Sequence, residues 1–346
     1  MKKVYIVAGE TLNNVADNVT DLLKKVDSGE IQIRTSPFKY NHSMDRKELS
    51  GIDSYSRLVL HPLNNLIKKI SFFEANEKIG TVFASEFGPM NSNMKVLREL
   101  FYEGAGSVSP KKFAGTVSNT CLGHICMRYG FKGISSMFVG SSPLPYAFRV
   151  LQIGRGNSML IGSLDEYNED FYADFENHTN FKHGKAEGAN ALYLINEDLV
   201  GNYNLDFMVE ILSVANIVSG DLNYRADTIS MDENFFIRGI KKAIEKANIK
   251  GEEIDEIYTI SNSDTAMEEV EDEAIDKVLP RAEKIKFNKL SKTGFLVASL
   301  QNLVIACESL KAKKAEKTIL VNGISACGQF TTTIIRGGES WKVEIF

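Results

Sequence analysis

The chain has 346 residues, which is enough for two typical domains, or one large one, to bury a core. Its composition is that of a globular protein, with 43% hydrophobic and 25% charged residues, and its formal net charge of -5 argues against a basic nucleic-acid-binding protein. No stretch approaches the roughly 18 apolar residues of a membrane span, and the apolar run after Lys3 ends at Glu10, too soon for a signal peptide.

Beta-branched and apolar runs recur along the chain and alternate with stretches that have the period of amphipathic helices. The predicted strands are residues 4–7, 81–84, 158–162, 191–195, 208–215, 257–260, 318–321 and 331–335. The predicted helices are residues 56–70, 94–102, 144–153, 233–247, 268–279 and 295–312. This alternation predicts an α/β fold whose sheet is covered on both faces. Comparable sets lie before and after about residue 200, so we expect two similar halves, residues 1–200 and 201–346.

The segment from residue 133 to 143 has the pattern of a strand that turns sharply into a helix. The extended run ends at Gly140, two serines follow, and Pro143 stands in the first helical turn, where its missing N–H costs little. The start of a helix leaves backbone N–H groups unpaired, as an oxyanion or thiolate site requires. Serine before an apolar run is also an ordinary helix cap, so the pattern alone does not establish a site.

Cysteine and acidic residues give no sign of a metal or cofactor. A zinc site from Cys121, His124 and Cys126 is disfavoured, because on a helix Cys126 lies roughly 200° around from His124. The acidic residues 268–273 read as a solvent-exposed helix face. The cysteines lack paired CxxC spacing, which is typical of reduced thiols in a cytoplasm. They are Cys121, Cys126, Cys307 and Cys327.

A series of short motifs resembles the β-ketoacyl-acyl-carrier-protein synthases. The family's nucleophile turn, the helix after it, and its I-x-x-G-x-A-D and A-G-G-x-E motifs have their likeness in residues 133–166. Further similar motifs are residues 109–113 (SPKKF), 119–125 (NTCLGHI), 186–189 (AEGA) and 322–328 (NGISACG). The likeness extends from about residue 50 to 336. It implies a thiolase-like fold of five αβαβα layers in two similar halves, and a dimer formed through the region of the nucleophile.

The resemblance also assigns the family's catalytic positions, a Cys nucleophile and two His residues. A gapless count back from Gly154 puts the nucleophile position at Met137, whose side chain has no ionisable proton. The first His position holds Ser261 and the second holds Phe295. Met, Ser and Phe supply neither a nucleophile nor a general base, which indicates a catalytically inactive ketosynthase-like subunit.

Inactive relatives of this family are the chain-length-factor subunits of type II polyketide and polyene systems. The resemblance implies a heterodimer with an active ketosynthase, in which this chain shapes the tunnel for an acyl chain carried by acyl carrier protein. The helix at residues 119–129 would then lie at the dimer interface, and Met137, Phe138 and Phe295 would fill the vestigial active site. The candidate tunnel and interface residues are Asn119, Cys121, His124, Cys126, Met127 and Phe138.

Two other functions stay open. A divergent enzyme on this scaffold, an acyltransferase, decarboxylase or hydrolase, would use Ser141, Ser142 or Cys327 as its nucleophile. A homodimeric acyl- or lipid-binding protein would have kept the tunnel and lost the chemistry. Chain length, product class and the identity of the carrier protein are not encoded in any motif.

Overall fold

The computed structural model describes residues 1–71, 75–178, 187–203, 207–219, 233–260, 265–287 and 295–339. The strands are β1 (Val4–Leu12), β2 (Gly80–Ser85), β3 (Ser135–Val139), β4 (Ser158–Asp165), β5 (Gly188–Asn196), β6 (Phe207–Val218), β7 (Glu256–Tyr258), β8 (Glu283–Ile285), β9 (Thr318–Ile324) and β10 (Gln329–Glu339). All eight predicted strands are present, and the extended run before Gly140 forms β3. The short strand β8 was not predicted, because two of its three residues are charged.

The sheet consists of two halves with the same strand order. From its outer edge inward, the N-terminal half reads β3-β2-β4-β5-β1 and the C-terminal half reads β8-β7-β9-β10-β6. The pairing directions also match, since the two outer pairings of each half are parallel and the two inner ones antiparallel. The halves join where Val4, Tyr5 and Ile6 pair with β6. The structure thus has the expected two similar halves, while a boundary at residue 200 stays a prediction.

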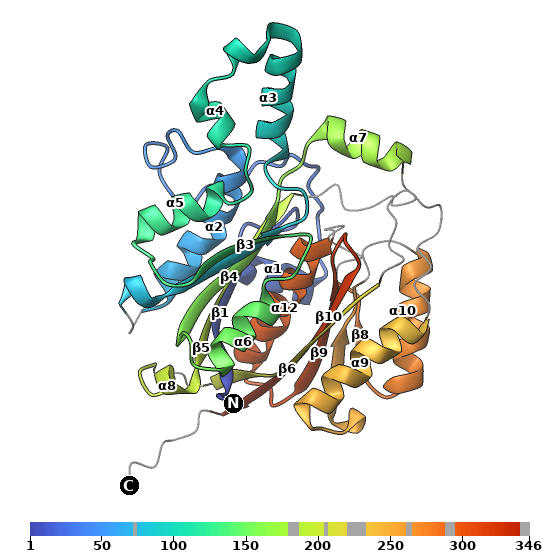
Figure 1. Ribbon diagram of the computed structural model, residues 1–346. Helices are drawn as coiled ribbons and strands as arrows, with labels where there is room; N and C mark the ends of the chain where they lie inside the picture. Colours follow the sequence, from blue (N-terminus) through green and yellow to red (C-terminus); the bar gives the residue numbers. More distant parts are fainter. Residues whose placement is uncertain are drawn as a thin grey trace.

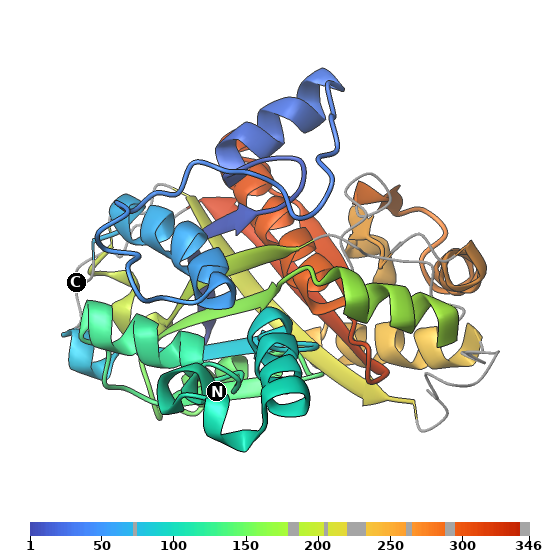
Figure 2. The same ribbon diagram turned by 90° about the horizontal axis from the view of Figure 1, so that it is seen from above.

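Helices cover both faces of each half and complete the five αβαβα layers (Figure 1). The outer helices of the N-terminal half share one apolar cluster, and those of the C-terminal half share two others. Figure 2 shows α12 running between the two halves, where it and α6 join strands of both in a single core. The first helical layer consists of α2 (Ser54–Lys69) and α5 (Thr120–Tyr129). The central layer consists of α6 (Leu144–Gln152) and α12 (Phe295–Lys313), and the last of α9 (Glu233–Ala247) and α10 (Thr265–Val278).

The remaining helices lie at the periphery. They are α1 (Val19–Ser28), α3 (Met90–Glu103), α4 (Pro110–Ala114), α7 (Glu169–His178) and α8 (Glu197–Val200). Helices α3 and α4 project from the body of the molecule next to α5 (Figure 1). Within the described ranges, no helix has the length and apolar character needed to cross a membrane.

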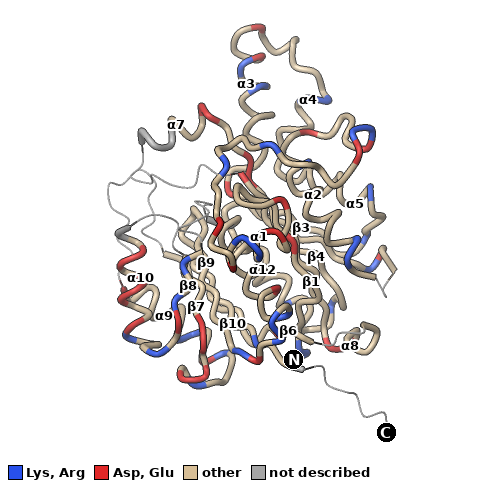
Figure 3. The backbone as a smooth tube through the Cα atoms, turned by 180° about the vertical axis from the view of Figure 1, so that it is seen from behind, with Lys and Arg blue, Asp and Glu red and all other residues tan. Residues whose placement is uncertain are grey.

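One expectation about the acidic helix α10 is wrong. Its acidic residues colour much of the helix in Figure 3, but Glu268 and Glu271 are buried rather than exposed. The three-residue spacing places both on the same face as the core residues Ala274 and Ile275. The Glu271 carboxylate accepts hydrogen bonds from the backbone N–H of Ile260 (3.0 Å) and from Nδ2 of Asn322 in β9 (2.9 Å).

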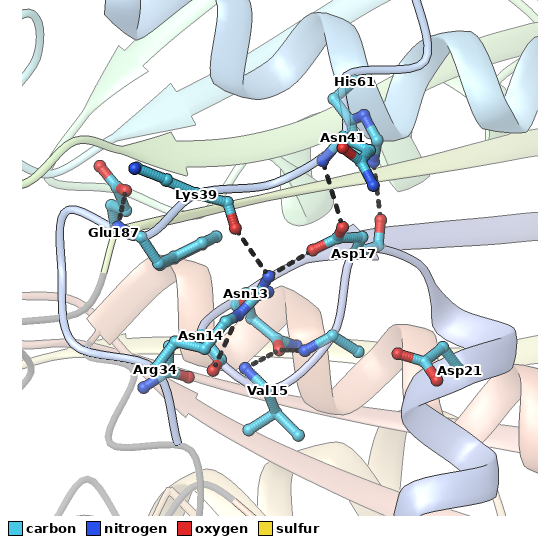
Figure 4. A network of polar contacts seen from close by, with 12 residues as sticks. Asn13, Asn14, Val15, Asp17, Asp21, Arg34, Lys39, Asn41, His61 and Glu187 are labelled. Atoms are coloured by element: carbon cyan, nitrogen blue, oxygen red, sulfur yellow. Dashed lines mark hydrogen bonds and ion pairs between the residues drawn. The ribbon is translucent and has the colours of Figure 1, made fainter. Parts of the chain in front are cut away.

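The segment between α1 and α2 is held to both its neighbours by polar contacts (Figure 4). Arg34 donates a hydrogen bond to Oδ1 of Asp17 at 2.6 Å. His61, which is buried in α2, has both ring nitrogens occupied: Nε2 lies 2.7 Å from the carbonyl oxygen of Asp17, and Nδ1 accepts the N–H of Ser43 at 3.0 Å. Because Nδ1 accepts a backbone N–H, the ring is neutral in this arrangement.

Candidate functional site

The carboxyl ends of β2, β3 and β4 meet at one edge of the N-terminal half. Ser85 lies opposite Val139 in the parallel pair β2–β3, and Asp165 ends the neighbouring strand β4. The turn between β9 and β10 in the C-terminal half reaches this edge, since the backbone N–H of Ala326 donates to Oε1 of Glu86 at 2.8 Å. The two halves therefore contribute jointly to a site at the end of β3.

The chain leaves β3 through a turn that only glycine fits. Gly140 has a φ of 68°, and its N–H donates to the carbonyl oxygen of Ser85 at 2.9 Å. A Cβ atom at this position would lie 2.4 Å from Sγ of Cys327. Glycine tolerates both the left-handed backbone and the close contact. The side chain of Cys327 thus packs directly on the turn.

Ser141 and Ser142 follow Gly140 and lead into α6. The Ser142 N–H donates to Oε1 of Gln329 at 2.6 Å, and its hydroxyl accepts the N–H of Leu144 at 3.4 Å. The hydroxyl of Ser142 therefore contacts the first residue of α6, although the N-cap residue of this helix is Pro143. The structure also brings together the three alternative nucleophiles named from the sequence, because Cys327 is exposed at the same turn.

Two buried acids, Glu86 and Asp165, support the turn, and sequence reasoning missed both. Asp165 accepts hydrogen bonds from Oγ of Ser85 (2.7 Å) and from the N–H groups of Glu86 (3.0 Å) and Phe87 (3.1 Å). Burial raises the pKa of Asp165 to about 6, against the lowering effect of these donors. The available signal was an acid that follows each apolar run within a few residues, Glu86 after residues 81–84 and Asp165 after residues 158–162.

The structure places Met137 in β3, and its assignment to the nucleophile position stays a prediction. Met137 lies in the middle of β3, opposite Phe83, three residues before Gly140. Helix α6 begins only at Leu144 and has nine residues, so a count back from Gly154 without a gap runs past the turn and into the strand. The residues at the turn are Gly140, Ser141 and Ser142. Ser261 lies outside the described residues, and so does the side chain of Phe295, the first residue of α12.

An open groove of about 810 Å³ runs between α5 and β3. Of the candidate tunnel residues, Asn119 and Cys126 line it, and Met137 lines it from β3. The interface helix expected at residues 119–129 is present as α5. The groove therefore receives part of the predicted tunnel set.

The other candidate tunnel residues point elsewhere. Cys121 is fully buried, and burial raises the pKa of its thiol to about 12. His124 faces Asp53, with 3.6 Å between Nε2 and Oδ2. Phe138 packs on the opposite face of the sheet, against Tyr146. Met127 is exposed on the outside of α5. A helix distributes its side chains around its axis, so the candidates on α5 do not all face the groove.

The described residues contain no group of three or more His, Cys, Asp or Glu side chains that could hold a metal ion. The cysteines are all unpaired.

Comparison with known proteins identifies the fold. No protein-family model matches the chain, and no curated protein matches it. Among solved structures, the chain resembles the ishigamide ketosynthase/chain length factor with a TM-score of 0.79 and 16% identity over 96% of this chain and 99% of that chain.

Two further structures give the same result. One is a chain in the structure of a type II PKS acyl-carrier protein in complex with its ketosynthase bound to the hexaketide. It matches with a TM-score of 0.78 and 16% identity, over 97% of this chain and 99% of the matched chain. A beta-ketoacyl synthase from Burkholderia phymatum has a TM-score of 0.77 and 14% identity over the same shares. The chain therefore has the thiolase-like fold of the ketosynthases and chain length factors.

Proposed function

We propose that this chain is a catalytically inactive subunit of the chain-length-factor type. It would pair with an active ketosynthase in the cytoplasm and shape the tunnel for an acyl chain delivered by acyl carrier protein, in the assembly of a polyketide, a polyene or a specialised fatty acid. The observation that carries the proposal is the turn at the end of β3. Neither Met137 in β3 nor the residues of the turn, Gly140, Ser141 and Ser142, is the cysteine that a ketosynthase of the resembled family needs.

Pairing is supported by an uncovered face on the N-terminal half. Strand β3 is an edge of the sheet, and an edge strand offers unpaired backbone groups to a second chain. Exposed apolar residues lie on β3, on α5 and on the projecting helices α3 and α4 with the turn after them, and such residues are usual on a surface that a partner covers. They are Leu97, Leu100, Phe101, Tyr102, Phe113, Val117, Met127 and Val139.

The proposal is tested by purifying the tagged full-length chain from its native cells and identifying what accompanies it. We expect a stoichiometric ketosynthase with an intact Cys-His-His set. The purified chain alone should form no β-ketoacyl product from malonyl and acyl carrier-protein thioesters, whereas the pair should. Condensation by the isolated chain would refute the proposed inactivity.

A variant of the edge strand tests the pairing surface. Val139→Glu places a charge on the 59% exposed valine of β3 and should reduce recovery of the partner at least about tenfold. Val218→Glu is the matched control, because Val218 is 65% exposed but lies at the end of β6. Equal recovery with both variants would show that the partner binds elsewhere.

A second candidate, a divergent acyltransferase, is favoured by the position of Cys327 at the turn. Cys327 would lose its proton, and the resulting thiolate would attack the thioester carbonyl of an acyl carrier. A new thioester would form on Cys327, and the carrier would leave as a thiolate that takes up the proton lost by Cys327. Incubation with acyl thioesters followed by intact-mass measurement would reveal the adduct. Loss of that adduct in Cys327→Ala, but not in Cys121→Ala, would favour this candidate over the inactive subunit.

A further inference from the structure

A second recess lies away from the turn and from the groove at α5. It has a volume of about 400 Å³ and is bounded by α6 on one side and by β6 on the other, near the end of α9 (Figure 1). A volume of this size is in the range of small-molecule sites.

The walls of this recess are mainly apolar. Pro145 and Phe148 line it from α6, and Leu212 and Val214 line it from β6. Phe148 and Val214 also belong to the central core, so this wall is fixed by packing on its inner side. An apolar surface of this kind is suited to an alkyl chain.

The charged groups of the recess are all positive. Arg149 and Lys246 line it, and no Asp or Glu does so among the described residues. Across the described part of the chain, neither cation has a carboxylate within ion-pair distance. Arg149 donates to Sδ of Met1 at 2.8 Å, and Lys246 donates to the carbonyl oxygen of Val214 at 3.1 Å. A thioether is a weak acceptor, so Arg149 is held loosely.

A third cation adds to the positive charge. Lys242 stands one helical turn before Lys246 on α9, and its Nζ donates to the carbonyl oxygen of Asn216 at 3.3 Å. Burial, together with the charge of Lys242, lowers the pKa of Lys246. The two lysines cover a stretch of β6 that β1 leaves unpaired, because β1 pairs with β6 only at Val209–Ile211. Capping that edge explains the lysines but not Arg149 or the apolar recess beside them.

We propose that this recess binds an anionic amphiphile with a single carboxylate, such as a medium-chain fatty acid. The carboxylate would contact Arg149 and Lys246, and the alkyl chain would lie along Phe148 and Leu212. The inference goes beyond the proposed function and does not depend on it, since the recess shares no lining residue with the turn or with the groove at α5.

The test is a calorimetric titration of the full chain with decanoate. We expect saturable binding at one site, with acetate and decanol each binding at least about tenfold more weakly, because each supplies only the charge or only the chain. Arg149→Gln and Lys246→Gln should each weaken decanoate binding about tenfold, the effect of one lost charge-assisted contact. Both positions are exposed, so the variants should fold.

Lys241→Gln serves as the control, because Lys241 is an exposed lysine of α9 that does not line the recess. It should bind decanoate as the unmodified chain does. An absence of decanoate binding, or binding that neither Arg149→Gln nor Lys246→Gln weakens, would overturn the proposal. Recovery of a partner ketosynthase should be the same for all three variants, so this result and the test of the proposed function are read separately.

Discussion

At Gly140, a single missing side chain lets the two halves of the molecule touch. Gly140→Ala should destabilise the fold by roughly 2–4 kcal/mol, the sum of the left-handed strain and the overlap with Cys327. In a Cys327→Ala background the overlap disappears, so the penalty of Gly140→Ala should fall to about 1–2 kcal/mol. Urea denaturation of the four proteins measures this coupling.

The control for this cycle is Gly29→Ala. Gly29 has a similar φ of 73°, but no atom lies within 4 Å of the position of its Cβ. It should show the strain alone, about 1–2 kcal/mol, in either background. Strictly additive effects of Gly140→Ala and Cys327→Ala would mean that the two residues do not meet.

The buried Glu271 makes stability depend on pH. Burial raises the pKa of Glu271 from 4.5 to about 8, so the folded chain holds a proton that the unfolded chain releases. The stability that comes from the protonated Glu271 is fully present below about pH 4.5 and is lost as the pH rises through about 8. Glu271→Gln mimics the protonated acid. From pH 5 to pH 9, the free energy of unfolding of this variant should rise by at least about 1 kcal/mol relative to that of the unmodified chain.

Chemical denaturation at the two pH values checks this expectation, with Glu273→Gln as the control. Glu273 lies two residues further along the same helix and is exposed. Its variant should keep the pH dependence of the unmodified chain. A Glu271→Gln variant with that same dependence would contradict a protonated Glu271.

At the scale of elements, the segment between α1 and α2 should loosen in acid. Burial holds the pKa of His61 below its usual 6.5, so the unfolded chain binds more protons as the pH falls. Stability from His61 is present above about pH 6.5 and is lost on further acidification. His61→Gln should cost about 1–2 kcal/mol at pH 7.5 and show a smaller loss between pH 7.5 and 5. Equal losses of stability on acidification in this variant and in the unmodified chain would contradict a neutral His61.

The helices and strands were predictable where burial of one face or of both gives the sequence a recognisable pattern. The contacts between distant residues that build the site were not. Strands such as β4 and β5 are buried throughout and were found from the sequence, as were α9 and α12. The start of α6 was also predictable, because Gly140 and Pro143 mark the turn that leads into this helix. The approach of Cys327 to this turn was not predictable, because Cys327 comes from the turn between β9 and β10 in the other half. The burial of Glu271 was missed because it depends on Asn322, which is 51 positions away in the chain.

At the scale of the whole molecule, α12 joins the two halves into one cooperative unit. Leu303 is buried in the core that α12 shares with strands of both halves. Leu303→Ala should cost about 2–5 kcal/mol and should speed amide hydrogen exchange in β4 and β9 alike. Leu63→Ala, in the outer layer of the N-terminal half, should speed exchange in β4 more than in β9. A Leu303→Ala effect confined to one half would show that the halves unfold separately.

The shared strand order places β3 and β8 at equivalent ends of the sheet, so these are the two positions where a further strand could add. They differ in what they offer. Strand β8 has only three residues, and its Lys284 is paired with Asp276 at 2.7 Å. A short, charged edge resists strand addition, so among the described strands β3 is the end better suited to a partner strand. Under the proposed pairing through β3, an assembly that grows through one end only would close as soon as two copies or two relatives meet, and no filament would form.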